Sequence, residues 1–191
     1  MKTLLLTIFG LSIVLGFSQT QNFTVHLGDD SIGFLTAKRL KKGDSETIRI
    51  TSDTKFSILL LKQKMRTNSV SIFKRDSLKV NKSESALNDN ADVVTTSHKG
   101  NEYLLSKDGK SSSLRDKISF TVSKLYFYEP KNVSSIYSER HLSFCTITPV
   151  KENMYRLVLP NGNVNYYTYK AGKLVSMTSK RYGMILKFVG V

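Results

Sequence analysis

Alternating hydrophobic and polar positions dominate the chain from about residue 23 onward. Residues 23–27, 47–51 and 154–159 each place apolar side chains at every second position, which is the repeat of a half-buried strand. Turn signals separate such runs at a short and regular spacing, as in sandwiches and barrels. A sheet with so many strands must curl to protect its edges. The pattern predicts a mainly β chain, with a curved antiparallel sheet of about ten strands forming a half-barrel or barrel.

Four segments give more specific expectations. Gly33 interrupts an alternating run and predicts a bulge or a close backbone approach. Asn161 and Gly162 predict a type I′ hairpin turn, which needs positive φ at both central positions. Residues 83–91 are rich in Asn, Asp and Ser and indicate a loop or a ragged hairpin tip. Residues 56–61 are largely apolar and indicate a buried run.

One segment departs from the strand pattern. Val122, Leu125 and Tyr126 have the spacing of one helix face, which predicts a short helix over Ser119–Phe127. The β-branched and aromatic side chains of the same segment argue equally for a strand, so both alternatives stay open. Pro130 restricts the residue before it and ends the element in either case.

The N-terminus has the three parts of a secretory signal peptide. Lys2 is followed by an apolar stretch over residues 4–15, and small residues stand at the peptidase positions before Gln19. The stretch is too short for a bilayer-spanning helix, although a short membrane anchor is the alternative. We therefore expect a signal peptide over residues 1–18 and a single β domain over 19–191. The protein would be periplasmic or secreted, with no transmembrane span after signal removal.

The charge balance bears on the partners. Lys and Arg number 29 against 15 Asp and Glu, which gives a net charge of +14 and a pI near 9.8. Such a balance often indicates nucleic-acid binding. An exported protein with no recognition motif does not fit that role, so we expect no nucleic-acid partner. An anionic membrane surface or a polysaccharide fits the compartment better, and plain solubility is the alternative.

Catalytic motifs are scarce in the sequence. Three His and one Cys cannot supply the usual zinc spacings, and neither a nucleophile elbow nor a phosphate-binding loop is present. We therefore expect no metal, no cofactor and no enzymatic activity. Cys145 lies in an alternating run and is expected to be a small buried hydrophobe.

Two kinds of residue are candidates for ligand contacts: a cluster of polar side chains and several tyrosines. Residues 138–141 are the densest polar cluster, and on a strand Glu139 and His141 would share a face. A cross-strand ion pair is the structural alternative for the cluster, and core packing is the alternative for the tyrosines. The candidate ligand-binding residues are Tyr126, Tyr128, Tyr137, Glu139, Arg140 and Tyr166.

Three stretches together resemble a family of uncharacterised secreted proteins of Gram-negative bacteria, classed as a domain of unknown function. These stretches are Val25–Lys38, Leu125–Pro130 leading into Ile136–His141, and Tyr155–Leu174. More distantly, the layout resembles the half-barrels of Lol-type lipoprotein carriers, in which a curved sheet wraps around a helix. That resemblance implies an apolar cleft and a ligand-holding fold, and it implies no catalytic residues.

These observations predict an exported, non-enzymatic protein that holds a hydrophobic or amphiphilic ligand, or an envelope partner, in its concave face. A basic rim would orient the anionic head of such a ligand. The alternative is a surface or interaction module with a filled core, which binds an acidic partner or glycan through its basic surface. The presence or absence of a cleft between the strands distinguishes the two architectures.

Overall fold

The computed structural model describes residues 16–58, 61–181 and 183–191, and in them 14 strands form one antiparallel sheet. The strands follow the order β8-β7-β6-β5-β4-β3-β2-β1-β14-β13-β12-β11-β10-β9. The sheet does not close, because β8 and β9 are its two edges. The prediction of a mainly β, antiparallel chain is confirmed.

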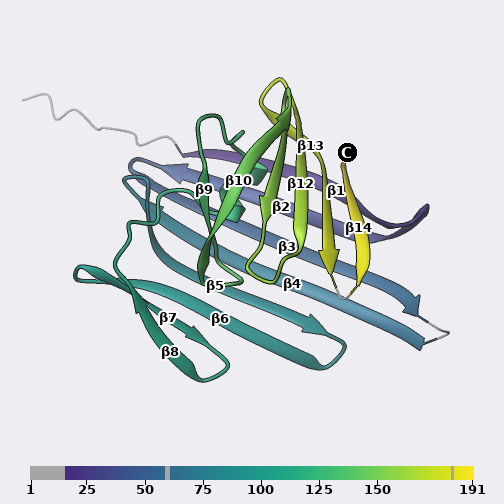
Figure 1. Cartoon of the computed structure of the whole chain (residues 1–191), viewed down its shortest axis with the longest axis horizontal. Coiled ribbons are helices and arrows are strands. Elements are labelled where there is room, and N and C mark those ends of the chain that lie inside the picture. The colour runs from purple at the N-terminus through teal and green to yellow at the C-terminus, as the bar shows by residue number, and fades with distance from the viewer. Residues whose placement is uncertain (1–15, 59–60, 182) are drawn as a thin grey trace, which may run out of the picture.

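The first half of the sheet is a meander of long hairpins, which Figure 1 shows as the broad lower layer. Its strands are β1 (Phe17–Leu27), β2 (Asp30–Lys42), β3 (Ser45–Ile58), β4 (Leu61–Lys74), β5 (Ser77–Leu87), β6 (Asn90–Lys99), β7 (Glu102–Lys107) and β8 (Lys110–Leu114). Each of these strands pairs with the next along the chain.

The second half is a meander that lies across the first (Figure 1). Its strands are β9 (Ser135–Ser138), β10 (Ser143–Lys151), β11 (Met154–Val158), β12 (Val164–Lys170), β13 (Lys173–Arg181) and β14 (Met184–Gly190). Strand β14 pairs with β1, with Val25 opposite Phe188, and so joins the two halves. The sheet therefore folds back over itself and can bury a core between its halves.

The core lies on the facing sides of the two halves. Period-two burial is clear in β12, where Asn165, Tyr167 and Tyr169 are buried and the residues between them are partly exposed. The largest fully buried side chains come from both halves and from the segment that links them: Tyr103, Tyr137, Tyr167, Phe23, Phe73, Ile48, Leu78, Ile118, Leu125, Ile136, Ile147 and Leu157. Cys145 is buried among them, as expected.

Of the two alternatives for Ser119–Phe127, a short helix or a strand, the structure favours the first in a reduced form, the 3₁₀ helix η1 (Val122–Tyr126). The turn contacts β3, β9 and β13, so it lies between the two halves of the sheet. Thr121 bridges Tyr137 of β9, which ties the start of the turn to the sheet. In the described residues no α-helix occurs, because tertiary contacts hold this aromatic and β-branched segment in a tighter form.

The count of about ten strands was too low, because the polar strands lack the expected apolar alternation. Residues 83–87 belong to β5 and residues 90–91 to β6, so of the two alternatives for residues 83–91 the loop is wrong and a hairpin is present, with its tip at residues 88–89. Strand β8 has the sequence Lys-Ser-Ser-Ser-Leu and forms only because β7 supplies its pairing partner. Backbone pairing therefore defines these strands, and side-chain burial does not.

The structure confirms the irregularity expected at Gly33 and contradicts the turn type expected at Asn161 and Gly162. A Cβ on Gly33 would lie 2.1 Å from the Asp53 carbonyl oxygen, and the β1–β2 register shifts beside it, so the bulge is confirmed. The hairpin at residues 159–163 has positive φ at Gly162 but not at Asn161, so it is not type I′. Pro160 stands at the first central position and fixes a negative φ there.

The two remaining expectations concern hydrophobic segments. Phe56 is buried as expected, whereas Leu61 is 67% exposed, and residues 59–60 of that run lie outside the described residues. Most of the expected signal peptide, residues 1–15, also lies outside them. Cleavage before Gln19 would shorten β1 by two residues and leave its pairing from Gln19 onward intact. No helix in the described part of the chain has the length and apolar character needed to cross a bilayer.

Candidate functional site

A groove lies between the two halves of the sheet. It holds about 870 Å³ of atom-free space with its open mouth included, of which about 120 Å³ can be reached by the centre of a water molecule. Strands β2–β5 line it from one half and β9 and β12–β14 from the other, and η1 and the turn after β9 also contribute residues. These dimensions suit a slender occupant.

The groove has both apolar and polar lining. Its apolar side chains include Leu35, Ile50, Met65, Val122, Tyr126, Met177 and Phe188. Its hydroxyl-bearing side chains from the first half are Ser52, Thr54, Thr67, Ser69, Ser83 and Ser85. An apolar pocket with a few placed polar groups is the usual composition of a small-molecule site.

The groove exists because small hydroxyl residues occupy inward positions of β3–β5. Ser83 and Ser85 lie on the buried face of β5, where larger aliphatic residues would fill the space between the halves. Ser69 and Ser83 bond each other across the strands at 2.6 Å, and Asn81 donates to Ser69 at 3.2 Å. These hydrogen bonds satisfy the polar side chains of Ser69 and Ser83, which line the groove where no core side chain fills the space.

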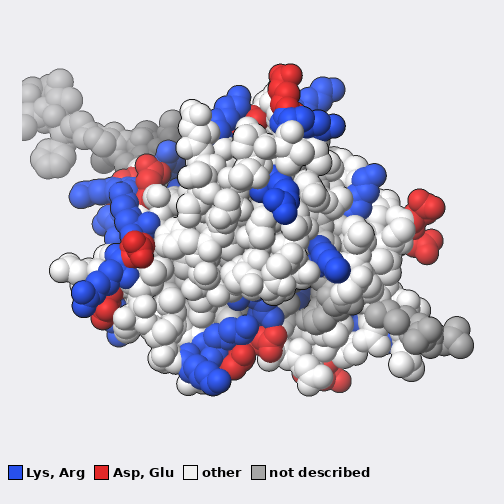
Figure 2. Space-filling model, in the orientation of Figure 1, with Lys and Arg blue, Asp and Glu red and all other residues white. Residues whose placement is uncertain are grey.

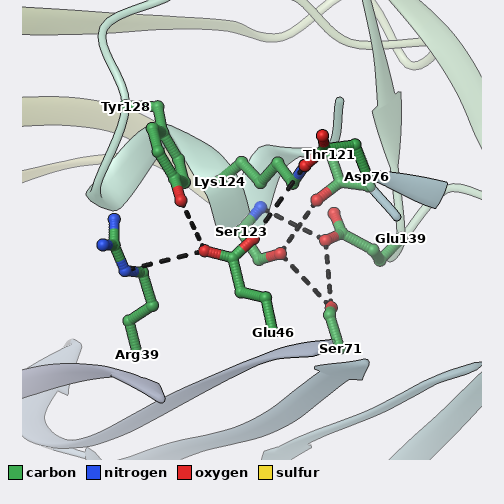
Figure 3. A network of polar contacts seen from close by, with 9 residues as sticks. All are labelled: Arg39, Glu46, Ser71, Asp76, Thr121, Ser123, Lys124, Tyr128 and Glu139. Carbon is green, nitrogen blue, oxygen red and sulfur yellow. Dashed lines mark hydrogen bonds and ion pairs between the residues drawn. The ribbon is translucent and has the colours of Figure 1, made fainter. Parts of the chain in front are cut away.

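Glu139 is the buried charged residue of the groove lining. It belongs to the turn between β9 and β10, its residue is 4% exposed, and Oε1 accepts hydrogen bonds from Ser71 Oγ at 3.3 Å and from the Ser123 backbone N–H at 3.2 Å. Ser71 in turn accepts bonds from Ser123 Oγ and Asn81 Nδ2. Glu139 is thus held in place by elements from both halves (Figure 3).

Two further polar atoms in the lining lack partners. Asn165 Oδ1 and Thr67 Oγ1 are buried and have no hydrogen-bond partner among the described residues. Asn165 is only 7% exposed, so its carboxamide is largely removed from bulk water. An unpaired buried acceptor costs about 1–3 kcal/mol. Such a cost is commonly offset by a ligand or an ordered water.

A second polar network lies beside the groove and holds η1 against the first half (Figure 3). Glu46 of β3 accepts a hydrogen bond from Tyr128 at 2.6 Å and lies 3.6 Å from Arg39 Nε. Its other oxygen lies 4.0 Å from Lys124 Nζ, which also lies 3.8 Å from Asp76. The Lys124 side chain is only 7% exposed, and its ammonium lies over the Phe73 ring. This network is a structural brace built from buried charges.

Burial changes the proton affinity of several groups in these networks. Desolvation lowers the pKa of Lys124, while the Glu46 and Asp76 carboxylates act in the opposite direction. Desolvation, aided by the hydrogen bond to Glu46, raises the pKa of Tyr128 to about 12. Burial also raises the pKa of Tyr137 to about 12 and raises that of the Cys145 thiol. A raised pKa keeps Cys145 in its unreactive thiol form.

The buried tyrosines predict a loss of stability in alkali. Between pH 10 and about 12 the unfolded state would lose the Tyr137 proton while the folded state keeps it. The folded state then binds more protons, so the free energy of unfolding falls as pH rises through this window and is unaffected by Tyr137 below it. Urea titrations from pH 8 to about 12, with tyrosinate absorbance recorded in parallel, would measure this fall.

Tyr137→Phe is expected to reduce the alkaline slope, and Tyr166→Phe on the outer face is the matched control. An equal alkaline slope in the wild type and the Tyr137→Phe variant would contradict the assignment. Lys124 contributes with the opposite sign, because its lowered pKa makes stability rise with pH just below its usual value of 10.5.

The structure brings three of the six candidate residues into the groove lining: Tyr126, Glu139 and Arg140. Arg140 Nη2 lies 2.6 Å from Asp92 Oδ2, which fixes its guanidinium toward β6. Glu139 and His141 were expected to share a strand face, but both lie in the turn after β9. His141 is bonded through Nδ1 to Ser138 Oγ at 2.9 Å.

The other three candidates lie outside the groove lining. Tyr128 belongs to the Glu46 network, and Tyr137 is a core residue that bonds Thr96 and packs against Phe144. Tyr166 points to the outer side of β12, because the inward positions of that strand are odd-numbered. Alternation alone could not tell which of the two faces of β12 is inward.

The sequence analysis missed several lining residues, notably Asn165, Tyr167 and the serines of β5. For the serines, the available signal was their placement at every second position, Ser83 and Ser85. The composition of this segment resembles that of a solvated loop, which concealed the signal. Among the residues that the structure describes, no group of three or more His, Cys, Asp or Glu side chains could hold a metal ion.

Comparison with known proteins supports a single family assignment. No curated protein and no solved structure shows significant similarity to this chain. The comparisons indicate no enzyme family, and the expectation that the chain resembles an uncharacterised domain family is confirmed. The chain belongs to the family DUF6134, a domain of unknown function, whose family model matches residues 23–189.

Proposed function

We propose that the protein is an exported, non-enzymatic binding protein that holds a slender amphiphilic ligand in the groove between its two half-sheets. The observation that carries this proposal is a mixed lining, in which apolar side chains are combined with buried polar groups that lack protein partners. Burial of an aliphatic chain against Leu35, Ile50 and Phe188 would supply about 0.8 kcal/mol per CH₂.

The groove favours a ligand-holding protein over a module with a filled core. A filled core would leave no lined space between the halves, whereas 21 residues from eight strands, η1 and the turn after β9 surround the groove. Export rests on the expected signal peptide and is part of the proposal. The Lol-type half-barrel has the same general plan of a curved sheet over an apolar cleft, which supports the proposal as an analogy only.

The surface charge gives weaker support for an anionic partner than the groove gives for a ligand. On the face shown in Figure 2, most Lys and Arg residues lie toward the periphery, with Asp and Glu among them, and the centre is mostly uncharged. This face shows no single continuous cationic patch. An anionic membrane surface or polysaccharide therefore stays a prediction that rests on the net charge of +14.

Filling the groove is expected to weaken binding strongly. Ser85→Phe places a large side chain at an inward position of β5, while Val80→Phe adds the same ring at an exposed position of that strand. We expect Ser85→Phe to weaken the binding of a lipophilic dye by about tenfold or more and Val80→Phe to leave it unchanged. A dye titration followed by fluorescence measures both.

Native mass spectrometry after gentle purification is the complementary measurement. Recovery of the bare polypeptide alone, together with no dye binding to the wild type, would contradict the proposed function. Equal dye binding by the Ser85→Phe variant and the wild type would also contradict it, provided that circular dichroism shows both to be folded.

A further inference from the structure

The buried carboxylate of Glu139 gives the groove a chemical preference that the net charge of the chain does not suggest. Resting on the proposed function, we infer that the groove selects an aliphatic ligand whose head group is an ammonium, with Glu139 as its counter-ion. The basic composition by itself predicts an anionic head. The local chemistry of the groove is the reverse.

The hydrogen bonds that Glu139 accepts come from electrically neutral groups. None of the ion pairs in the described part of the chain includes it, and its bonds come from a hydroxyl and a backbone amide that both meet Oε1. In Figure 3 its other oxygen points away from these donors and carries no dashed contact. A desolvated carboxylate without a cation is costly, and an ammonium would supply both charge and N–H donors.

Asn165 independently provides a second acceptor in the groove. It is more than nine-tenths buried, it lines the same groove, and its Oδ1 has no partner. A carboxamide oxygen accepts hydrogen bonds and cannot donate them. Together with the Glu139 carboxylate, it provides acceptors for a head group that donates. An ionised ligand carboxylate has no proton to offer to the Glu139 carboxylate, whereas the Asn165 NH2 group could donate to it, so Glu139 carries the discrimination.

Arg140 is the cationic residue closest to Glu139 along the chain, and it does not reverse this preference. Its guanidinium is engaged by Asp92 through Nη2 at 2.6 Å and by the Asp92 carbonyl oxygen through Nη1 at 3.4 Å. Lys124, the other cation drawn near Glu139 in Figure 3, is paired with Glu46 and Asp76. The lining therefore combines the buried Glu139 carboxylate with hydroxyl groups that can either donate or accept.

The test compares three probes with the same chain and different heads. Dodecylammonium, dodecanol and dodecanoate are titrated into the full chain by calorimetry at neutral pH, below the concentrations at which they form micelles. We expect dodecylammonium to bind about tenfold or more tightly than dodecanoate, with dodecanol between them. This comparison uses the wild type and does not depend on the folding of any variant.

The outcomes separate this inference from the function it rests on. If dodecanoate binds as tightly as dodecylammonium, or more tightly, the amine preference is overturned while the binding function stands. If none of the three binds, the proposed function itself is overturned, and the inference with it.

Two matched variants locate the preference. Glu139→Gln is expected to remove the discrimination between dodecylammonium and dodecanoate while dodecanol still binds. Glu152→Gln removes an exposed carboxylate in the turn between β10 and β11, outside the groove lining, and is expected to preserve the discrimination. A folded Glu139→Gln variant that keeps the wild-type discrimination would overturn the role of Glu139.

Discussion

Replacing Gly33 with alanine is expected to lower the free energy of unfolding by about 3–5 kcal/mol. Gly33 has φ of 151°, and a Cβ at this position would lie 2.1 Å from the Asp53 carbonyl oxygen and 2.8 Å from Thr54 Cα. Both contacts are with the backbone of β3, which cannot move without breaking the β2–β3 ladder. Urea unfolding followed by circular dichroism measures the loss.

Gly28 provides the matched control for this prediction. It has φ of 62°, and an added Cβ would meet nothing within 4 Å. Gly28→Ala is therefore expected to cost only the backbone penalty of about 1–2 kcal/mol. If the two variants lose the same stability, the close approach of β2 and β3 at Gly33 has no energetic consequence, and the prediction is wrong.

Glu46→Leu is expected to destabilise the protein by a similar amount, about 3–5 kcal/mol. The substitution removes the carboxylate that accepts the Tyr128 hydroxyl and faces both Arg39 and Lys124. Lys124 would remain buried with only the exposed Asp76 near its ammonium. Breaking one side of a buried ion pair costs more than the pair contributes, because the other charge is left desolvated.

The second substitution Lys124→Met tests this reason. In the double variant the orphaned ammonium is gone, so we expect it to recover about half of the stability that Glu46→Leu loses. Lys124→Met alone leaves Glu46 paired with Arg39 and is expected to have a smaller effect than Glu46→Leu. A double variant no more stable than Glu46→Leu would show that the uncompensated charge of Lys124 is not the cause.

These two sites lay beyond what the sequence could assign in full. Gly33 was identifiable as an irregularity, since glycine inside an alternating run has a known meaning. The partner that makes it obligatory, the Asp53 carbonyl, is set only by the β2–β3 register. Glu46 and Lys124 lie 78 residues apart (124 − 46). No periodicity connects them, because η1 reaches β3 through the tertiary fold.

The groove, too, could be predicted only in part from the sequence. The polar cluster around Glu139 stood out in the sequence, but its burial depends on Ser71, 68 residues earlier, and on the amide of Ser123. Tyr166 of β12 was chosen as a candidate ligand-binding residue. The alternation of β12 is equally compatible with the opposite face, which carries Asn165 and Tyr167, and that face is the inward one. An inward asparagine contradicts the usual rule for core faces, and such exceptions occur at binding sites.

The sequence by itself determined the strand-rich class and the bulge at Gly33, because two-residue alternation and glycine placement are local properties. It also carried the expectation of export. Only the tertiary structure decided that the sheet has 14 strands, that it folds over itself, and that serines line a groove between its halves. The physical reason is that polar strands form through pairing with neighbours, and burial depends on which surfaces distant segments cover.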